Sequence, residues 1–225
     1  MIKYRKIKKE EIEQVATLFS NAFYEDVLFN TFLNKHKNNK NAFYDLFLIQ
    51  TKVFYKKQTC LVGIYNNEVI AASFLRQGDK TNLKLIDYLK AGGFSYIKKY
   101  GIKTVFNLLS VSKKIEKSFE PENPLFWFLE LYAVSSKMQQ EGIGSKMMER
   151  AIIPYIIKHN GNILNLTTNT PKNRYFYEKN GFKEIANTTI KKNRNVINNW
   201  CYEIKISKKN ATIISRLADY ILPIK

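Results

Sequence analysis

The stretch from Phe126 to Arg150 constrains the fold more than any other part of the chain. Its first nine residues are dominated by apolar and aromatic side chains and follow Pro124, which predicts a buried strand at 126–134. A polar turn and a helix come next, and Gly142 and Gly144 stand where that helix begins. The first N–H groups of a helix attract phosphate, and glycine lets such a ligand come close. The pattern predicts either a phosphate-binding loop or an ordinary turn into a helix.

Length and composition favour one compact unit. The chain has 225 residues, of which 45% are hydrophobic, and we expect a single domain over residues 1–225. No run approaches the roughly 20 apolar residues that cross a bilayer, and the N-terminal residues are charged where a signal peptide is apolar. We therefore expect a cytoplasmic protein that does not bind membranes. Two cysteines and two histidines, far apart in sequence, predict neither a disulfide framework nor a metal site.

The formal charge of +18 suggests attraction to anions, including nucleic acids. However, the lysines are spread along the chain, and the sequence is also rich in Asn and Ile, so a compositional bias explains the charge equally well. We expect no specific nucleic-acid partner. A monomer and a homodimer are both compatible with the sequence.

Periodicity and turn signals predict a chain in which strands and helices are mixed. We expect strands at 2–7, 60–65, 68–75, 126–134, 162–167, 182–190 and 196–206. The first helix is expected to start within 8–11 and to end at 23. Further helices are expected at 22–33, 42–55 and 173–180, with a helical insertion at 83–119 and a C-terminal helix within 208–225. Pro154 lies in the helix that follows Gly144, which predicts a kink or an early end there.

Two motifs resemble those of the GCN5-related N-acetyltransferase (GNAT) superfamily. That family has a strand of the form Leu-x-x-Leu-x-Val before a [Gln/Arg]-x-x-Gly-x-[Gly/Ala] loop, and here residues 129–134 and 139–144 stand in those places. Residues 173–182 are similar to a second motif, Asn-x-x-x-Tyr-x-x-x-Gly-Phe. The segment 22–29 looks more loosely like one subgroup, which includes proteins similar to puromycin acetyltransferase. Gln140 departs from the pattern, because many members have glycine there.

The resemblance implies a fold, a co-substrate and a reaction. The fold would be a single α+β domain with a mixed, mostly antiparallel central sheet, flanked by helices, with the helical insertion between the third and fourth strands. The reaction would be transfer of an acetyl group from acetyl-CoA to an amine, with no metal. The implied cofactor-binding residues are Ala133, Val134, Gln139, Gln140, Glu141, Gly142, Ile143, Gly144, Ser145 and Asn173. For Asn173, a cap for its own helix is the preferred alternative to cofactor binding.

The same resemblance makes Tyr177 the candidate general acid, which would give a proton to the departing thiolate. A core aromatic packed beside Tyr175 and Phe176 is the alternative. Glu130 is the candidate base, because a carboxylate in an apolar strand needs a function or a partner. An ion pair with one of the many cationic residues explains it equally well. Strand alternation predicts that Glu130, Tyr132 and Val134 share one face.

The acceptor site would be formed by residues 23–33, 83–119 and 191–200. These segments are rich in aromatic residues, which favours a small amine with an apolar portion over a long acidic peptide. A second hypothesis is a GNAT fold that binds acyl-CoA as a sensor or scaffold without turnover.

Overall fold

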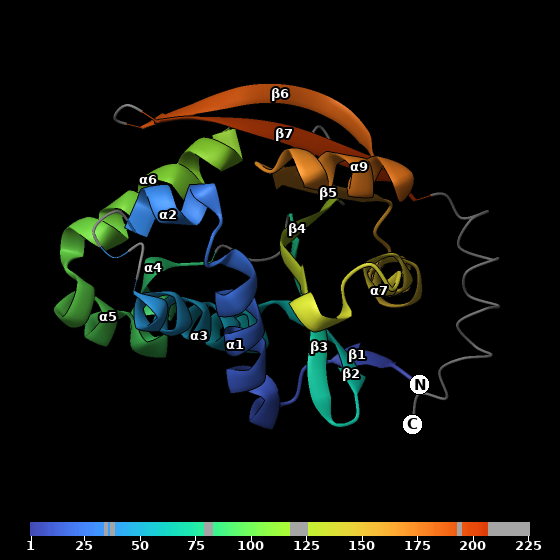
Figure 1. Ribbon diagram of the computed structural model, residues 1–225, viewed down its shortest axis with the longest axis horizontal. Helices are drawn as coiled ribbons and strands as arrows, with labels where there is room; N and C mark the ends of the chain where they lie inside the picture. The colour runs from blue at the N-terminus through green and yellow to red at the C-terminus, as the bar shows by residue number, and fades with distance from the viewer. Residues whose placement is uncertain (34–35, 37–38, 79–82, 118–125, 193–194, 207–225) are drawn as a thin grey trace.

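A computed structural model describes residues 1–33, 36, 39–78, 83–117, 126–192 and 195–206. The described chain forms one seven-stranded sheet with helices on both faces (Figure 1). The strands are β1 Lys3–Lys6, β2 Thr59–Tyr65, β3 Glu68–Gln77, β4 Phe126–Val134, β5 Ile163–Thr168, β6 Lys183–Lys192 and β7 Asn195–Lys205. The α-helices are α1 Ile12–Phe23, α2 Val27–Leu33, α3 Lys40–Lys57, α4 Leu85–Tyr88, α5 Phe94–Tyr100, α6 Ile102–Lys117, α7 Ile143–Met147, α8 Ile153–Lys158 and α9 Pro171–Lys179.

The strand order is β1-β2-β3-β4-β5-β7-β6, and every neighbouring pair is antiparallel except β4 and β5. β4 and β5 can be parallel because the helical segment between them, α7 to α8, carries the chain back to the end of the sheet at which β4 began. Helices α4 to α6 stand between β3 and β4 in the chain. The predicted single α+β domain, with a mixed, mostly antiparallel sheet and helices between the third and fourth strands, is confirmed.

The two faces of the sheet carry separate cores. On one, which we call the α3 face, α1, α3 and α5 pack on the sheet, and the Phe74 ring lies 4.7 Å from that of Phe19 and 4.3 Å from that of Phe54. On the other, the α7 face, residues of α7, α8 and α9 surround Leu164 and Leu166. Figure 1 shows α1 and α3 on one side of β4 and α7 on the other. Side chains on alternate strand positions therefore belong to different cores.

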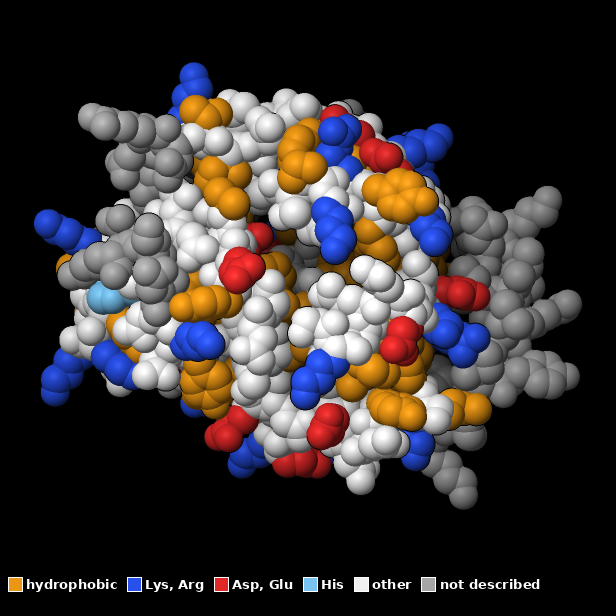
Figure 2. Space-filling view, viewed as in Figure 1, with side chains coloured by type: hydrophobic (Ala, Val, Ile, Leu, Met, Phe, Trp, Pro, Cys, Tyr) orange, Lys and Arg blue, Asp and Glu red, His pale blue; other side chains and the backbone are white. Residues whose placement is uncertain are grey.

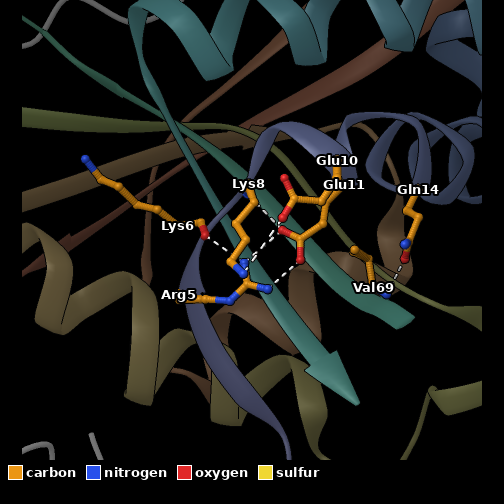
Figure 3. A network of polar contacts seen from close by, with 7 residues as sticks. All are labelled: Arg5, Lys6, Lys8, Glu10, Glu11, Gln14 and Val69. Atoms are coloured by element: carbon orange, nitrogen blue, oxygen red, sulfur yellow. Dashed lines mark hydrogen bonds and ion pairs between the residues drawn. The ribbon is translucent and has the colours of Figure 1, made fainter. Parts of the chain in front are cut away.

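The N-terminal strand is tied to the first helix by a polar network (Figure 3). Arg5 donates two hydrogen bonds to the carboxylate of Glu11, one of them 2.8 Å long, and the Lys8 N–H donates a third at 2.8 Å. The Gln14 side chain accepts from the Val69 N–H at 3.0 Å. The network therefore fixes β1 and β3 relative to the start of α1.

Pro154 does not end its helix early. The helical path runs from Ile143 to Lys158, but residues Met148–Ile152 adopt π-helical hydrogen bonding between α7 and α8. Proline has no N–H and its ring crowds the carbonyl four residues earlier. The wider π turn, which lies directly before α8, accommodates that missing bond.

Several boundaries differ from the sequence prediction, among them the start of α2, which is Val27 where the predicted helix begins at 22, and the end of β6, which is Lys192 where the predicted strand ends at 190. Helix α9 begins at Pro171, two residues before the predicted start, because proline suits the first position of a helix. Helix α3 extends the predicted 42–55 at both ends. The C-terminal helix expected within 208–225 lies outside the described residues. Among the helices that the structure describes, none combines the length and apolar character needed to cross a bilayer.

Candidate functional site

The two central strands part midway along β4. β4 pairs with β3 as far as Val134, but its pairing with β5 ends where Leu129 lies beside Leu166. Beyond that point, Thr167 and Thr168 of β5 continue to pair with β7 but no longer pair with β4. The last residues of β4 thus have strand partners on only one side in the described chain. Figure 2 shows that this face of the molecule is hollowed near its centre, over β4 and between α2 and α9 in the view of Figure 1.

A short loop connects the end of β4 to α7. Ser135 donates its N–H to the carbonyl of Ile70 at 2.8 Å, and the Gln139 side chain donates to the carbonyl of Val134 at 3.3 Å. Gln140 and Gly142 both have positive φ angles, 69° and 72°. Gln140 therefore adopts the left-handed conformation that glycine would take more readily. The residue that departs from the GNAT-like pattern is therefore also the residue with a strained backbone in this turn.

At Gly144 the two sequence motifs come into contact. A Cβ atom built on it would lie 3.0 Å from the Phe176 ring of α9 and 3.4 Å from the hydroxyl of Tyr132. That hydroxyl donates to the carbonyl of Gly144 at 2.7 Å. The start of α7 is therefore held closely against both β4 and α9, which needs a residue without a side chain.

The start of α7 faces open space. A Cβ atom on Gly142 would meet nothing within 4 Å, and Gln139 to Gly142 are exposed. The Lys146 N–H is bound to the Gly142 carbonyl at 2.9 Å, so the N–H groups of Ile143, Gly144 and Ser145 precede the first helical bond. Unpaired N–H groups at the positive end of a helix suit a phosphate group. The donor set therefore fits the pyrophosphate of acetyl-CoA.

Tyr177 is buried in the α7 core. Its side chain is 7% exposed, and its ring centroid lies 5.3 Å from that of Phe176, 5.6 Å from that of Phe182 and 6.0 Å from that of Tyr202. Its hydroxyl makes no hydrogen bond to any residue that the structure describes. Burial raises the pKa of Tyr177 above its usual range, so the hydroxyl keeps its proton at neutral pH. The ring is therefore part of the core, and the hydroxyl carries the proton that a general acid has to donate.

Asn173 neither caps its own helix nor lies in the loop before α7. Its side-chain amide donates to the hydroxyl of Thr168 at 3.2 Å, and that hydroxyl also receives the Thr170 N–H at 3.5 Å. The contact ties the start of α9 to the end of β5. Asn173 is itself exposed at this edge of the opening.

Glu130 pairs with Arg76. The Arg76 Nε donates to Oε1 of Glu130 at 2.5 Å, and the two side chains are 20% and 30% exposed. The guanidinium also lies 5.5 Å from the centre of the Phe128 ring. The sequence allowed two explanations for Glu130, a catalytic base or an ion pair with a cationic residue. The contact with Arg76 is such an ion pair. The partial exposure of the carboxylate keeps it open to solvent at the same time.

The prediction that Glu130 shares a face with Tyr132 and Val134 is wrong. Leu129 pairs with Leu75 and Leu131 with Phe74, so Glu130 is an extra residue, a β-bulge, in the pairing. Tyr132 and Val134 pack on the α7 face, whereas Glu130 contacts Arg76 on the α3 face. The bulge interrupts the alternation on which the prediction depended.

Asp26 was not identified from the sequence. Its carboxylate accepts the N–H groups of Leu28 at 2.9 Å and Phe29 at 3.1 Å and so caps α2. Burial nevertheless raises its pKa, and it forms no ion pair with the described residues. Asp before an apolar run signals a helix cap. The signal for a cap was present, but burial depends on tertiary contacts that the sequence does not show.

Comparison with known proteins agrees with this geometry. A GNAT acetyltransferase domain model matches residues 110–184. The polyamine N-acetyltransferase of Drosophila melanogaster, which forms N-acetylagmatine, superposes with a TM-score of 0.58 and 13% identity over 92% of this chain and 100% of its own. Arylalkylamine N-acetyltransferase 2 of Aedes aegypti gives 0.57 and 13% over 92% and 99%. No curated protein sequence matches the chain. The chain has the GNAT fold.

The domain model matches less than half of the chain, and the superposed structures show the fold. The matched residues 110–184 include β4, the loop before α7, and α9, and so contain every predicted catalytic and cofactor-binding residue. Asp26 and Arg76 lie outside the match.

Proposed function

We propose that the chain is an acetyl-CoA-dependent N-acetyltransferase that acts on the amine of a small molecule. The observation that carries the proposal is the parting of β4 and β5 beside the open start of α7. A strand edge offers amide hydrogen bonds, and a helix start offers a phosphate site. An acyl-CoA needs both, because it carries an amide-containing arm and a pyrophosphate.

The proposed cofactor residues divide by the groups they offer. Ala133 and Val134 contribute backbone groups at the strand end, and residues 140–145 contribute the N–H groups of the loop and helix start. Gln139 and Asn173 are proposed to support the site, because their side chains bind Val134 and Thr168. Acetyl-CoA supplies an acetyl group on a thioester, which is ready for attack by an amine.

Tyr177 is proposed as the general acid, because it holds its proton in a buried site and its hydroxyl has no described partner. A thiol has a pKa near 8.5, so a departing thiolate gains from that proton. For the base there are two candidates. Glu130 is paired with Arg76, and Asp26 is a half-buried carboxyl whose pKa is raised by burial.

The acceptor is proposed to be a small amine. The two neighbours named above are described as enzymes that act on amines, which supports this class. Aromatic side chains on the α3 face, among them Tyr24 and Phe29, suit an apolar portion. Kinship with the puromycin acetyltransferase-like subgroup, cytoplasmic location and a monomeric or homodimeric state remain predictions.

Titration of the purified protein with acetyl-CoA by calorimetry tests the first step, and Gly144→Ala is the matched variant. We expect binding by the wild type and weaker binding by the variant, since the added methyl group would push α7 away from Phe176. Absence of binding would refute the proposal. Binding without thiol release across a broad panel of amines would instead favour an acyl-CoA sensor.

A further inference from the structure

Asn165 is a buried amide for which the described chain offers no hydrogen bond. Its side chain lies in the middle of β5 and is 1% exposed, yet neither Nδ2 nor Oδ1 has a hydrogen-bond partner among the residues that the structure describes. Leaving a buried polar group unpaired is costly, so nearly all such groups in folded proteins are satisfied. An amide with both ends unsatisfied therefore indicates a partner that the described residues do not provide.

The position of Asn165 on the sheet shows which side that partner would occupy. Its neighbours Leu164 and Leu166 belong to the α7 core, so Asn165 points to the α3 face. Phe128 of β4 and Glu203 of β7 lie beside it in the strand pairing. Arg76, over the Phe128 ring, connects this row to Glu130. The orphan amide thus lies on the face opposite α7, one residue before the point where β4 and β5 part.

We propose that Asn165 binds an uncharged hydrogen-bonding group, such as a hydroxyl, at the end of the acceptor remote from its amine. The inference rests on the proposed function. An amide both donates and accepts, which matches a hydroxyl. A buried ammonium group would need a negatively charged partner, and the amide of Asn165 is neutral. The nearby carboxylate of Glu203 already has a cationic neighbour, since it lies 4.0 Å from Lys205.

The distance along the strand fits a small molecule. Phe128, beside Asn165, precedes Leu131 to Val134 by three to six residues. At a rise of about 3.3 Å per residue, this is about 10–20 Å. An acceptor of moderate length could place its amine beside the end of β4 and its polar end at Asn165. The alternative partner is an enclosed water molecule, which would satisfy the same amide without any substrate.

The test compares two acceptor series, n-alkylamines and ω-amino alcohols with three to eight carbons. Each is measured with the wild type, Asn165→Leu and the control Ser73→Ala. Ser73 is also fully buried with an unpaired hydroxyl, but it lies on the α7 face. We expect the wild type to favour the amino alcohol by about tenfold or more in kcat/KM at one chain length. Asn165→Leu should lose this preference, and Ser73→Ala should keep it.

Binding measured by calorimetry on the CoA-saturated proteins separates this inference from the proposed function. A wild type that acetylates amines with the same preference as Asn165→Leu would refute the subsite. So would a lower melting temperature of Asn165→Leu with unchanged preference, which is the result expected for an enclosed water. If no amine is acetylated, tighter binding of the amino alcohol by the wild type than by Asn165→Leu would still support the subsite, and equal binding would refute it.

Discussion

Tyr177→Phe separates a catalytic hydroxyl from a structural ring. The substitution removes one oxygen and leaves the contacts with Phe176, Phe182 and Tyr202 in place. Because the hydroxyl has no described partner, its loss should change the free energy of unfolding by less than about 1 kcal/mol and can even increase it. If the hydroxyl is the general acid, kcat should fall by about 10²–10⁴-fold.

The pH dependence gives a second measure. Burial raises the pKa of Tyr177 in the folded protein above that of an exposed tyrosine, about 10. The stability that this shift contributes is present below pH 10 and is lost as the pH rises above it, because only the unfolded chain then releases the proton. Tyr177→Phe should therefore lose less stability than the wild type between pH 9 and pH 11, as measured by urea unfolding.

Tyr202→Phe is the matched control. The Tyr202 hydroxyl donates to Glu178 at 2.8 Å and accepts from Arg174 at 3.2 Å, so its removal should lower the free energy of unfolding by about 1–2 kcal/mol. Turnover should change little. Thiol release at saturating acetyl-CoA, together with urea unfolding, measures both effects. Full turnover in Tyr177→Phe, or equal losses of turnover in both variants, would refute the role of the hydroxyl.

Four further substitutions test other parts of the structure. Gly144→Ala should lower the free energy of unfolding by about 1 kcal/mol through crowding of Phe176, seen as a fall of about 2–4 °C in Tm; an unchanged Tm would contradict the close approach. Glu11→Gln should cost about 1–3 kcal/mol at pH 7. Because Arg5 lowers the pKa of Glu11, that cost should disappear in urea unfolding as the pH falls below about 4. Asp26→Asn and Glu130→Gln should differ in kcat/KM, with the larger loss in the variant that lacks the base, and full turnover in both would exclude both carboxylates as the base.

Much of the fold could be predicted because local patterns and tertiary packing agree. The hairpin of β2 and β3 turns at Asn66 and Asn67, both with positive φ, as their sequence indicates. The strand, loop and helix at 126–150 also follow the predicted order. In each case the residue that marks the turn is also the residue whose backbone adopts it.

The candidate site was less predictable, because its details depend on contacts between distant segments. The partner of Glu130 is Arg76, which lies 54 residues earlier in the chain. Asn173 binds Thr168 instead of its own helix, and Asp26 becomes half-buried only when the chain packs around it. The orphan state of Asn165 likewise appears only after β5 is placed between β4 and β7. Sequence spacing shows which residues are near one another along the chain, not which groups lack a partner.

The bulge at Glu130 also affects how this protein can be compared and engineered. It acts as a one-residue phase shift within β4, so that positions before and after it follow opposite inside–outside patterns. Deleting Glu130 itself would make Leu129 and Leu131 consecutive on opposite faces, as regular alternation requires, and so would remove the bulge without exchanging any faces. Ungapped alignment with a relative that lacks the bulge would assign acceptor-side roles to cofactor-side residues. Grafting acceptor specificity onto this scaffold should therefore treat 126–129 and 131–134 as two separate segments.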